Sequence, residues 1–221
     1  MYFVGREKEV SQVQRALERR ENLVLMGKYG MGRTSLIRHV ARIARDRWRF
    51  IFADFSQTPG EICRHLARDL LPERKCKEKG LSYKSIRFRI STMDFTGQRH
   101  PVLVLDNIGK LTRPKMDLIR YLSQARRFLF VDIVETFLPS RDLFLLRSWL
   151  NPVKSISVSY LNLSKARDFF RHYAEEYYIP WTESDIHNLA KMSGGYPLGI
   201  KEIVERNLKR WAEGGIEPSY R

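Results

Sequence analysis

The chain has 221 residues, of which 43% are hydrophobic, a normal share for a packed globular protein. It contains no run of about 18 apolar residues, so no segment is predicted to span a membrane. The first residues lack the basic start and apolar stretch of a secretory signal. Cys63 and Cys76 come with no paired set of metal ligands. We therefore expect a cytoplasmic protein with two free thiols.

The charge of the chain is strongly positive. It carries 40 Lys and Arg residues against 25 Asp and Glu residues, a formal net charge of +15. Such a surface attracts polyanions, of which nucleic acid is the commonest; an arginine excess for thermal stability is the alternative. Arg38, Arg42 and Arg45 fall on one face of a predicted helix. A second basic stretch runs from Arg64 to Arg89.

Short apolar runs alternate with helical patterns over most of the chain. In chain order, the predicted elements are helix 12–20, strand 23–26, helix 34–47, strand 50–53, helix 62–71, strand 102–105, helix 114–124, strand 128–131, helix 142–150 and strand 156–158. The charged segment 73–84 is predicted to be a loop. Fully apolar strands that alternate with helices indicate an α/β fold with a parallel sheet covered on both faces.

From Ser164 onward the pattern is helical only, with predicted helices 166–177, 184–192 and 198–211. Ser164 and Thr182 are the expected N-caps of the first two. We therefore predict an α/β core over residues 1–161 and a small all-helical domain over residues 162–221.

The strongest motif is the segment Gly27-Lys28-Tyr29-Gly30-Met31-Gly32-Arg33-Thr34-Ser35. It follows an apolar strand and precedes an amphipathic helix, which is the context of a phosphate-binding loop. Glycines let successive backbone N–H groups turn toward phosphates, and the helix adds the positive end of its dipole. The Thr34 hydroxyl is placed to bind Mg²⁺. The motif predicts a P-loop for ATP or ADP; a glycine-rich turn without a ligand is the alternative.

Arg33 stands where the P-loop motif has lysine. Lysine presents a compact ammonium between the β- and γ-phosphates, whereas guanidinium is broad and planar. Arg33 can still pair with a phosphate through two donors. Because phosphoryl transfer depends mainly on positioning, we expect nucleotide binding with slow hydrolysis. Lys28 is a second cation within the loop.

Asp106 follows the apolar run 102–105, and Asn107 comes next. An acid at the carboxyl end of such a strand can hold Mg²⁺, directly or through water; a turn cap is the alternative role. Many P-loop ATPases have Glu after this Asp to polarise the attacking water. An amide cannot accept a proton as a carboxylate does, so Asn107 also predicts slow catalysis.

Two further segments resemble motifs of AAA+ and STAND-type ATPases, including the archaeal ATPase and origin-recognition groups. Residues 2–9, Tyr-Phe-Val-Gly-Arg-Glu-Lys-Glu, resemble the N-terminal box of that family, and residues 193–198, Ser-Gly-Gly-Tyr-Pro-Leu, resemble the G-G-x-P turn of its helical lid. With the P-loop and Asp106, the four motifs follow the family's order. The resemblance implies that Val4, Gly5 and Arg6 lie against adenine and that Pro197 approaches the base.

The resemblance also implies a polar residue that senses the γ-phosphate at the end of the strand beginning near residue 128. Asp132, Glu135 and Thr136 are the candidates, and the pattern does not choose among them. Arg141 and Arg147 are candidates for arginine fingers that act on a neighbouring subunit.

Three functions fit these features. The first is an ATP- and Mg²⁺-dependent switch that acts on DNA, with Asp106, Asn107 and Arg33 at its catalytic centre and a possible homo-oligomeric state. The second is a nucleotide-gated DNA- or protein-binding module without hydrolysis. The third is a STAND-like signalling ATPase with a protein partner. The basic charge favours DNA over a protein partner.

Overall fold

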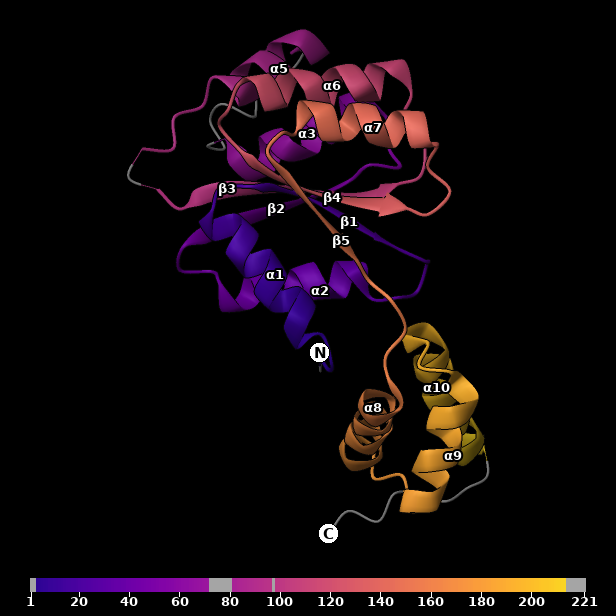
Figure 1. Ribbon diagram of the computed structural model, residues 1–221. Helices are drawn as coiled ribbons and strands as arrows, with labels where there is room; N and C mark the ends of the chain where they lie inside the picture. The colour runs from indigo at the N-terminus through magenta and orange to yellow at the C-terminus, as the bar shows by residue number, and fades with distance from the viewer. Residues whose placement is uncertain (1–2, 72–80, 97, 214–221) are drawn as a thin grey trace. The chain divides into compact units, whose positions relative to one another are not determined.

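The computed structural model describes residues 3–71, 81–96 and 98–213. Its centre is a five-stranded, wholly parallel sheet in the order β2-β3-β4-β1-β5 (Figure 1). The strands are β1 (Asn22–Gly27), β2 (Trp48–Asp54), β3 (His100–Ile108), β4 (Leu129–Glu135) and β5 (Val153–Ser157). The α/β fold predicted from alternating apolar strands and helices is therefore confirmed.

Helices cover both faces of the sheet. One face carries α1 (Glu7–Glu18) and α2 (Arg33–Ile43) (Figure 1). The other face carries α3 (Pro59–Leu70), α5 (Tyr83–Ser91), α6 (Arg113–Gln124) and α7 (Ser140–Trp149). Strands that are buried on both faces cannot alternate polar and apolar residues, which explains the continuous apolar runs in the sequence.

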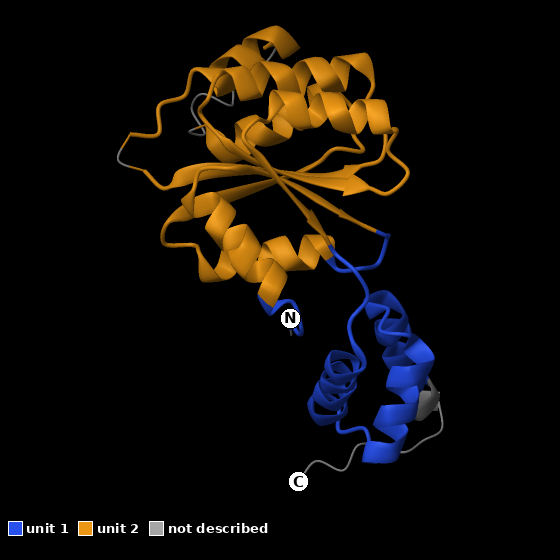
Figure 2. Cartoon of the chain, in the orientation of Figure 1, with its two compact units in different colours: residues 1–7, 28–32, 158–221 blue, residues 8–27, 33–157 orange. Residues whose placement is uncertain are grey.

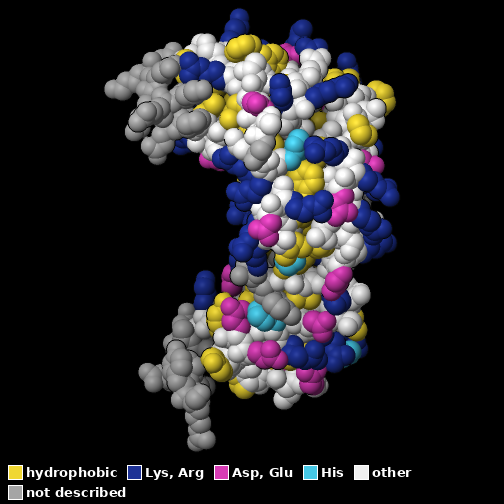
Figure 3. Space-filling view, turned by 90° about the vertical axis from the view of Figure 1, so that its left-hand side faces the viewer, with side chains coloured by type: hydrophobic (Ala, Val, Ile, Leu, Met, Phe, Trp, Pro, Cys, Tyr) yellow, Lys and Arg dark blue, Asp and Glu magenta, His cyan; other side chains and the backbone are white. Residues whose placement is uncertain are grey.

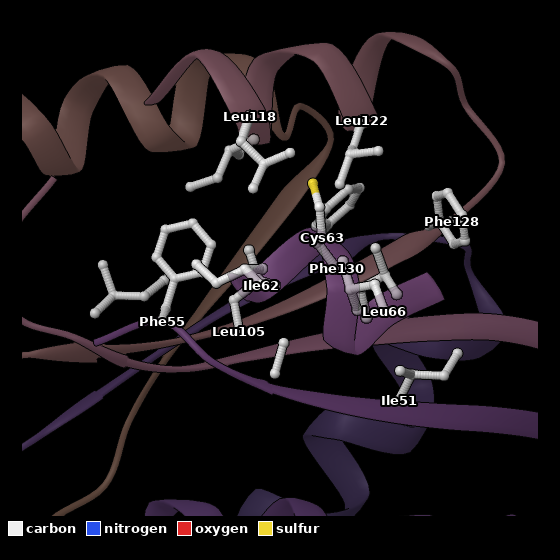
Figure 4. Packing of buried hydrophobic residues seen from close by; sticks show 14 of the residues in the cluster. Ile51, Phe55, Ile62, Cys63, Leu66, Leu105, Leu118, Leu122, Phe128 and Phe130 are labelled. Atoms are coloured by element: carbon white, nitrogen blue, oxygen red, sulfur yellow. The ribbon is translucent and has the colours of Figure 1, made fainter. Parts of the chain in front are cut away.

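The main hydrophobic cluster lies between the sheet and helices α3, α5, α6 and α7. Figure 4 shows Leu105 and Phe130 of the sheet together with Ile62, Cys63 and Leu118 of the helices. Cys63 is fully buried, and burial raises the pKa of its thiol to about 12. Cys63 is therefore a small core residue and not a nucleophile, while Cys76 lies outside the described residues.

The remaining helices are α8 (Leu163–Glu176), α9 (Glu183–Ser193) and α10 (Pro197–Glu213). They share a second hydrophobic cluster that includes Phe170, Ile186 and Ile200. Thr182 caps α9 as predicted, and its hydroxyl accepts the N–H of Asp185. The cap predicted at Ser164 is wrong: Asn162 caps α8, and the helix already begins at Leu163.

The chain forms two compact units (Figure 2). Unit 2 comprises residues 8–27 and 33–157 and contains the sheet. Unit 1 comprises the described parts of residues 1–7, 28–32 and 158–221, so it joins the first residues and five residues of the P-loop segment to helices α8–α10. Within the described ranges, every helix is too short or too polar to cross a membrane.

Element boundaries differ from the predictions in two informative places. The helix expected over 34–47 ends at Ile43, so Arg45 lies beyond it. The loop expected over 73–84 falls mostly on residues outside the described ranges, and its end is wrong because α5 begins at Tyr83. Ser82 caps α5 by accepting the N–H of Ser85.

Candidate functional site

The carboxyl ends of β1, β3 and β4 lie at the same edge of the sheet because the strands are parallel. β1 ends at Gly27, the first residue of the P-loop segment, and α2 begins at Arg33. Gly27 pairs in register with Glu135, the last residue of β4. Each unit holds part of this segment.

In unit 2, the two residues assigned to Mg²⁺ are in direct contact. The Thr34 hydroxyl donates a hydrogen bond of 2.9 Å to Asp106 Oδ2. The second carboxylate oxygen of Asp106 accepts the N–H of Asn107 at 2.9 Å. Hydroxyl and carboxylate oxygens are ligands that suit Mg²⁺, which takes its other ligands from water and phosphate. Within the described ranges, no cluster of three or more His, Cys, Asp or Glu could hold a metal by itself.

Asn107 is fixed by its backbone conformation and by a contact with Asp54. Its backbone is left-handed, with φ of +62°, a conformation that Asn tolerates better than most residues. Its amide donates a hydrogen bond of 3.1 Å to Asp54 Oδ1. Burial works to raise the pKa of Asp54, but hydrogen bonds from Ser56 and Asn107 outweigh it and lower the pKa below its ordinary value. A glutamate at position 107 would meet both the backbone strain and the Asp54 carboxylate.

Arg33 points toward the end of β4. Its guanidinium donates to the Val134 carbonyl through Nη1 and to Glu135 Oε1 through Nη2, both at 2.6 Å. Arg33 is 6% exposed and the Glu135 side chain 12% exposed, so water screens this ion pair weakly. The P-loop motif predicts only a phosphate partner for Arg33 and gives no sign of this carboxylate, which lies 102 residues away in the chain.

The three sensor candidates occupy different environments. Asp132 is fully buried between Phe130 and Val134, and neither of its oxygens has a hydrogen-bond partner. Burial raises the pKa of Asp132 well above its ordinary value. Thr136 is exposed, whereas the Glu135 side chain contacts a P-loop residue. Of the arginine-finger candidates, Arg147 is partly buried, with Nη2 3.6 Å from Met26 Sδ.

In unit 1, three successive carbonyls of the P-loop segment accept hydrogen bonds. Tyr196 Oη donates to Tyr29, the Leu198 N–H donates to Gly30 and Arg6 Nη2 donates to Met31, at 3.1, 3.2 and 3.3 Å. Arg6 Nη2 also donates to the Ser159 carbonyl at 2.5 Å. The buried Arg6 therefore holds two backbone carbonyls in place, and the adenine contact implied by the resemblance stays a prediction.

The glycines of this segment meet specific geometric demands. Gly30 and Gly32 have φ of +76° and +79°, with the buried Met31 between them. Alternating left-handed and right-handed residues turn successive N–H groups toward a common centre that suits an anion. A Cβ at Gly30 would collide with the Tyr196 hydroxyl and lie 2.7 Å from Leu198 Cβ. Lys28 turns its ammonium toward Tyr160, 3.4 Å from the hydroxyl.

A pocket of about 250 Å³ lies in unit 1 beside the N-terminal segment. Val4 and Gly5 line it, as do five residues of α8; the other lining residues are Phe3 and Glu7. Gly5 has φ of +70°, and a Cβ there would lie 2.7 Å from Lys165 Cβ. Pro197, the first residue of α10, is not among the residues that line this pocket. Ser35, the last residue of the P-loop segment, lies in the first turn of α2.

The sequence of residues 2–131 matches the family model of the AAA ATPase domain. The chain belongs to this family. The match covers the N-terminal box, the P-loop segment and the strand that carries Asp106. No curated protein matches the sequence.

Solved structures of AAA ATPases share the fold. The chain is similar to the Aeropyrum pernix Orc1 protein, solved in complex with DNA, with a TM-score of 0.71, 17% identity, and coverage of 100% of this chain and 63% of that one. Cdc6p from Pyrobaculum aerophilum gives a TM-score of 0.70, 16% identity, and coverage of 95% and 62%. The Thermotoga maritima RuvB Holliday junction branch migration motor gives a TM-score of 0.60, 16% identity, and coverage of 96% of this chain and 64% of that one. The chain thus spans less than two thirds of each of these proteins.

Proposed function

We propose that this AAA ATPase chain is an ATP-dependent switch that acts on DNA, with slow hydrolysis. Residues 1–161 form the nucleotide-binding core and residues 162–221 the helical lid. The observation that carries the nucleotide part is the hydrogen bond between Thr34 and Asp106, because it joins the P-loop helix to the acidic strand end. Mg²⁺ bound with ATP neutralises phosphate charge, and Thr34 and Asp106 are the residues that would hold it.

The remaining P-loop residues position the phosphate chain. The segment Gly27 to Ser35 supplies backbone N–H groups, and Arg33 supplies the cation. Arg6, Tyr196 and Leu198 fix the carbonyls of the segment, which leaves its shape dependent on the lid helices. Val4 and Gly5 place the adenine beside the N-terminal pocket, with Pro197 as a further contact to the base.

Slow hydrolysis follows from two residues. Asn107 donates its amide to Asp54 and cannot take a proton from an attacking water. Arg33 is engaged with Val134 and Glu135, so its guanidinium has competing partners. The same two observations favour a second candidate function, a nucleotide-gated binding module without turnover.

DNA binding through phosphates is supported by the distribution of charge. Residues 162–221 contain nine Lys and Arg and nine Asp and Glu, so the net charge of +15 belongs entirely to residues 1–161. On the face shown in Figure 3, Lys and Arg side chains outnumber acidic ones over the sheet-containing unit, whereas acidic and basic side chains are intermixed on the helical part. This separation favours a polyanion on the core, and phosphate contacts bind without reading sequence.

Two groups of exposed basic residues lie on or near the first two helices of the core. Arg38 and Arg42 are exposed on α2, and Arg45 is exposed just beyond its end. Arg15, Arg19 and Lys154 line a hollow of about 210 Å³ together with Gln12, Ala16 and Glu21. Of the second basic stretch, Arg87 packs over the rings of Tyr83 and Tyr121, whereas Arg74, Lys75, Lys77 and Lys79 lie outside the described residues.

One set of measurements tests the proposal: ATP binding and turnover by the full chain, each with and without DNA. Binding of ATP, a low turnover rate and a change of either with DNA are the expected results. ATP binding without turnover, still coupled to DNA, would favour the nucleotide-gated module. A chain that binds neither ATP nor DNA would contradict both functions.

A further inference from the structure

The ion pair between Arg33 and Glu135 joins the P-loop segment to the end of β4. Glu135 ends β4 and pairs in register with Gly27, where the P-loop segment begins. Arg33 begins α2, and its side chain reaches from that helix to the end of β4. Thr34 follows Arg33 in the chain, and Asp106 lies near the end of β3, the strand beside β4. The side chains of Thr34 and Asp106 form a hydrogen bond.

Two features stabilise the ion pair between Arg33 and Glu135 when no ligand is bound. Two charge-assisted donors of Arg33 are used at 2.6 Å, and both side chains are largely shielded from water. A phosphate that approaches the same guanidinium brings its oxygens close to the Glu135 carboxylate. Because weak screening makes this like-charge contact strongly unfavourable, Glu135 and the phosphate compete for one cation.

We propose that Glu135 is a specificity-determining residue, whose carboxylate is replaced by the terminal phosphate of a nucleoside triphosphate as the partner of Arg33. A diphosphate lacks the terminal phosphate and therefore competes less with Glu135 for Arg33. Glu135 therefore lowers the affinity for ATP more than the affinity for ADP. Removing its charge increases the preference for ATP, and removing Arg33 decreases it. This inference rests on the proposed binding of nucleotide at the P-loop.

The test compares the Kd values of ATP and ADP, measured by calorimetry with Mg²⁺ for the full chain and its variants. Glu135→Gln keeps the shape of the side chain and an acceptor for Arg33 but removes the charge. We expect the ratio of the ADP Kd to the ATP Kd to rise about tenfold, the scale of one charge-assisted interaction. Arg33→Gln leaves the Glu135 carboxylate facing the phosphate, and we expect that ratio to fall below the wild-type value.

Glu18→Gln is the matched control. Glu18 pairs with Arg47 at 3.4 Å on the exposed surface of unit 2, so this variant removes the same charge from another Arg–Glu pair. It should leave the ratio unchanged. An unchanged or lower ratio in folded Glu135→Gln would overturn the proposed exchange, in which phosphate replaces Glu135 as the partner of Arg33. Equal weakening of ATP binding and ADP binding in Arg33→Gln would also overturn it. If Glu135→Gln does not fold, the Arg33→Gln result decides. A wild-type chain that binds neither nucleotide would instead overturn the proposed function, and the exchange with it.

Discussion

The Thr34 hydroxyl lies 2.9 Å from Asp106 Oδ2, so a hydrogen bond links the first turn of α2 to strand β3 at the P-loop. The two residues are 72 positions apart in the chain. This contact places a hydroxyl oxygen beside a carboxylate oxygen, and both are suitable ligands for Mg²⁺. Its consequence is that either residue can be tested by its effect on the Mg²⁺ dependence of nucleotide binding.

The first prediction is that Mg²⁺–ATP stabilises the fold through Thr34. Ligand at 100 times its Kd adds roughly 2.7 kcal/mol to the free energy of unfolding. Thr34→Ala should lower the affinity for Mg²⁺–ATP by about tenfold, because one oxygen ligand is lost. Thr34→Ser retains the hydroxyl and should bind like the wild type. The measurement is thermal unfolding with ATP, in Mg²⁺ and in EDTA; a full Mg²⁺-dependent shift in Thr34→Ala would refute the assignment.

The second prediction concerns Arg33→Lys. Lysine cannot donate to the Val134 carbonyl and to Glu135 through one planar fork, so the variant should lose about 1 kcal/mol of stability. Its compact ammonium is freer to reach phosphate, so turnover should be maintained or raised. Denaturant unfolding and steady-state phosphate release measure the two effects. Wild-type turnover of about 1 s⁻¹ or faster that Arg33→Lys abolishes would show Arg33 to be an adapted catalytic residue.

The third prediction is that DNA affinity falls steeply with salt. Each duplex phosphate neutralised contributes about −0.9 to the slope of log K against log salt, so roughly five contacts give a slope near −4 or −5. The double variant Arg38→Glu and Arg42→Glu should weaken binding to all sequences alike and make the slope shallower. The measurement is fluorescence anisotropy with labelled single- and double-stranded DNA between about 50 and 200 mM salt.

The control for DNA binding lies in the electrically neutral helical segment. Lys201→Glu with Lys209→Glu changes the charge by the same amount at two exposed residues of α10. This variant should bind DNA more tightly than the Arg38 and Arg42 variant at every salt concentration. Equal losses in the two variants would mean that net charge alone matters and that α2 makes no contact.

The fourth prediction is that Asp132 destabilises the native state at neutral pH. Its folded-state pKa is raised above the unfolded value, so the native protein holds a proton that the unfolded chain releases. Stability therefore falls as pH rises from the unfolded pKa toward the folded one. Asp132→Val should raise the free energy of unfolding by about 1–3 kcal/mol at pH 7, and by less near pH 4.

Asp132→Asn separates charge from polarity in the same experiment. The amide does not titrate, so the pH dependence should flatten, but its donors would still lie in an apolar cluster and the gain should be smaller. Thermal unfolding between pH 4 and 8 measures both variants. An Asp132→Val protein that is less stable than the wild type at pH 7 would contradict the prediction.

Local patterns in the sequence were sufficient for most of the architecture. The continuous apolar run at 102–105 predicted a buried parallel strand because both faces of β3 are covered. Thr182 predicted the start of α9, since a cap depends on residues only three positions away. The contact of Thr34 with Asp106 was predictable because both follow strands whose carboxyl ends share one edge of the sheet.

Long-range pairings of side chains were not predictable in the same way. Nothing in the neighbourhood of Arg33 indicates that Glu135 is its partner, because strand order and register decide which residues meet. The hydrogen bond from Arg6 to the carbonyl of Ser159, 153 residues away, was missed for the same reason. Helix α5 was missed because its charged residues gave a weak periodic pattern.

The hydrogen bond from Tyr196 to Tyr29 has a consequence for the order of events during synthesis. The donor is made 167 residues after the acceptor, and the Leu198 bond to Gly30 comes later still. Because a chain leaves the ribosome from its N-terminus at about 5–20 residues per second, the P-loop segment waits on the order of ten seconds for these donors. A nascent chain therefore forms the hydrogen bonds that hold this segment only after residue 198 has been made.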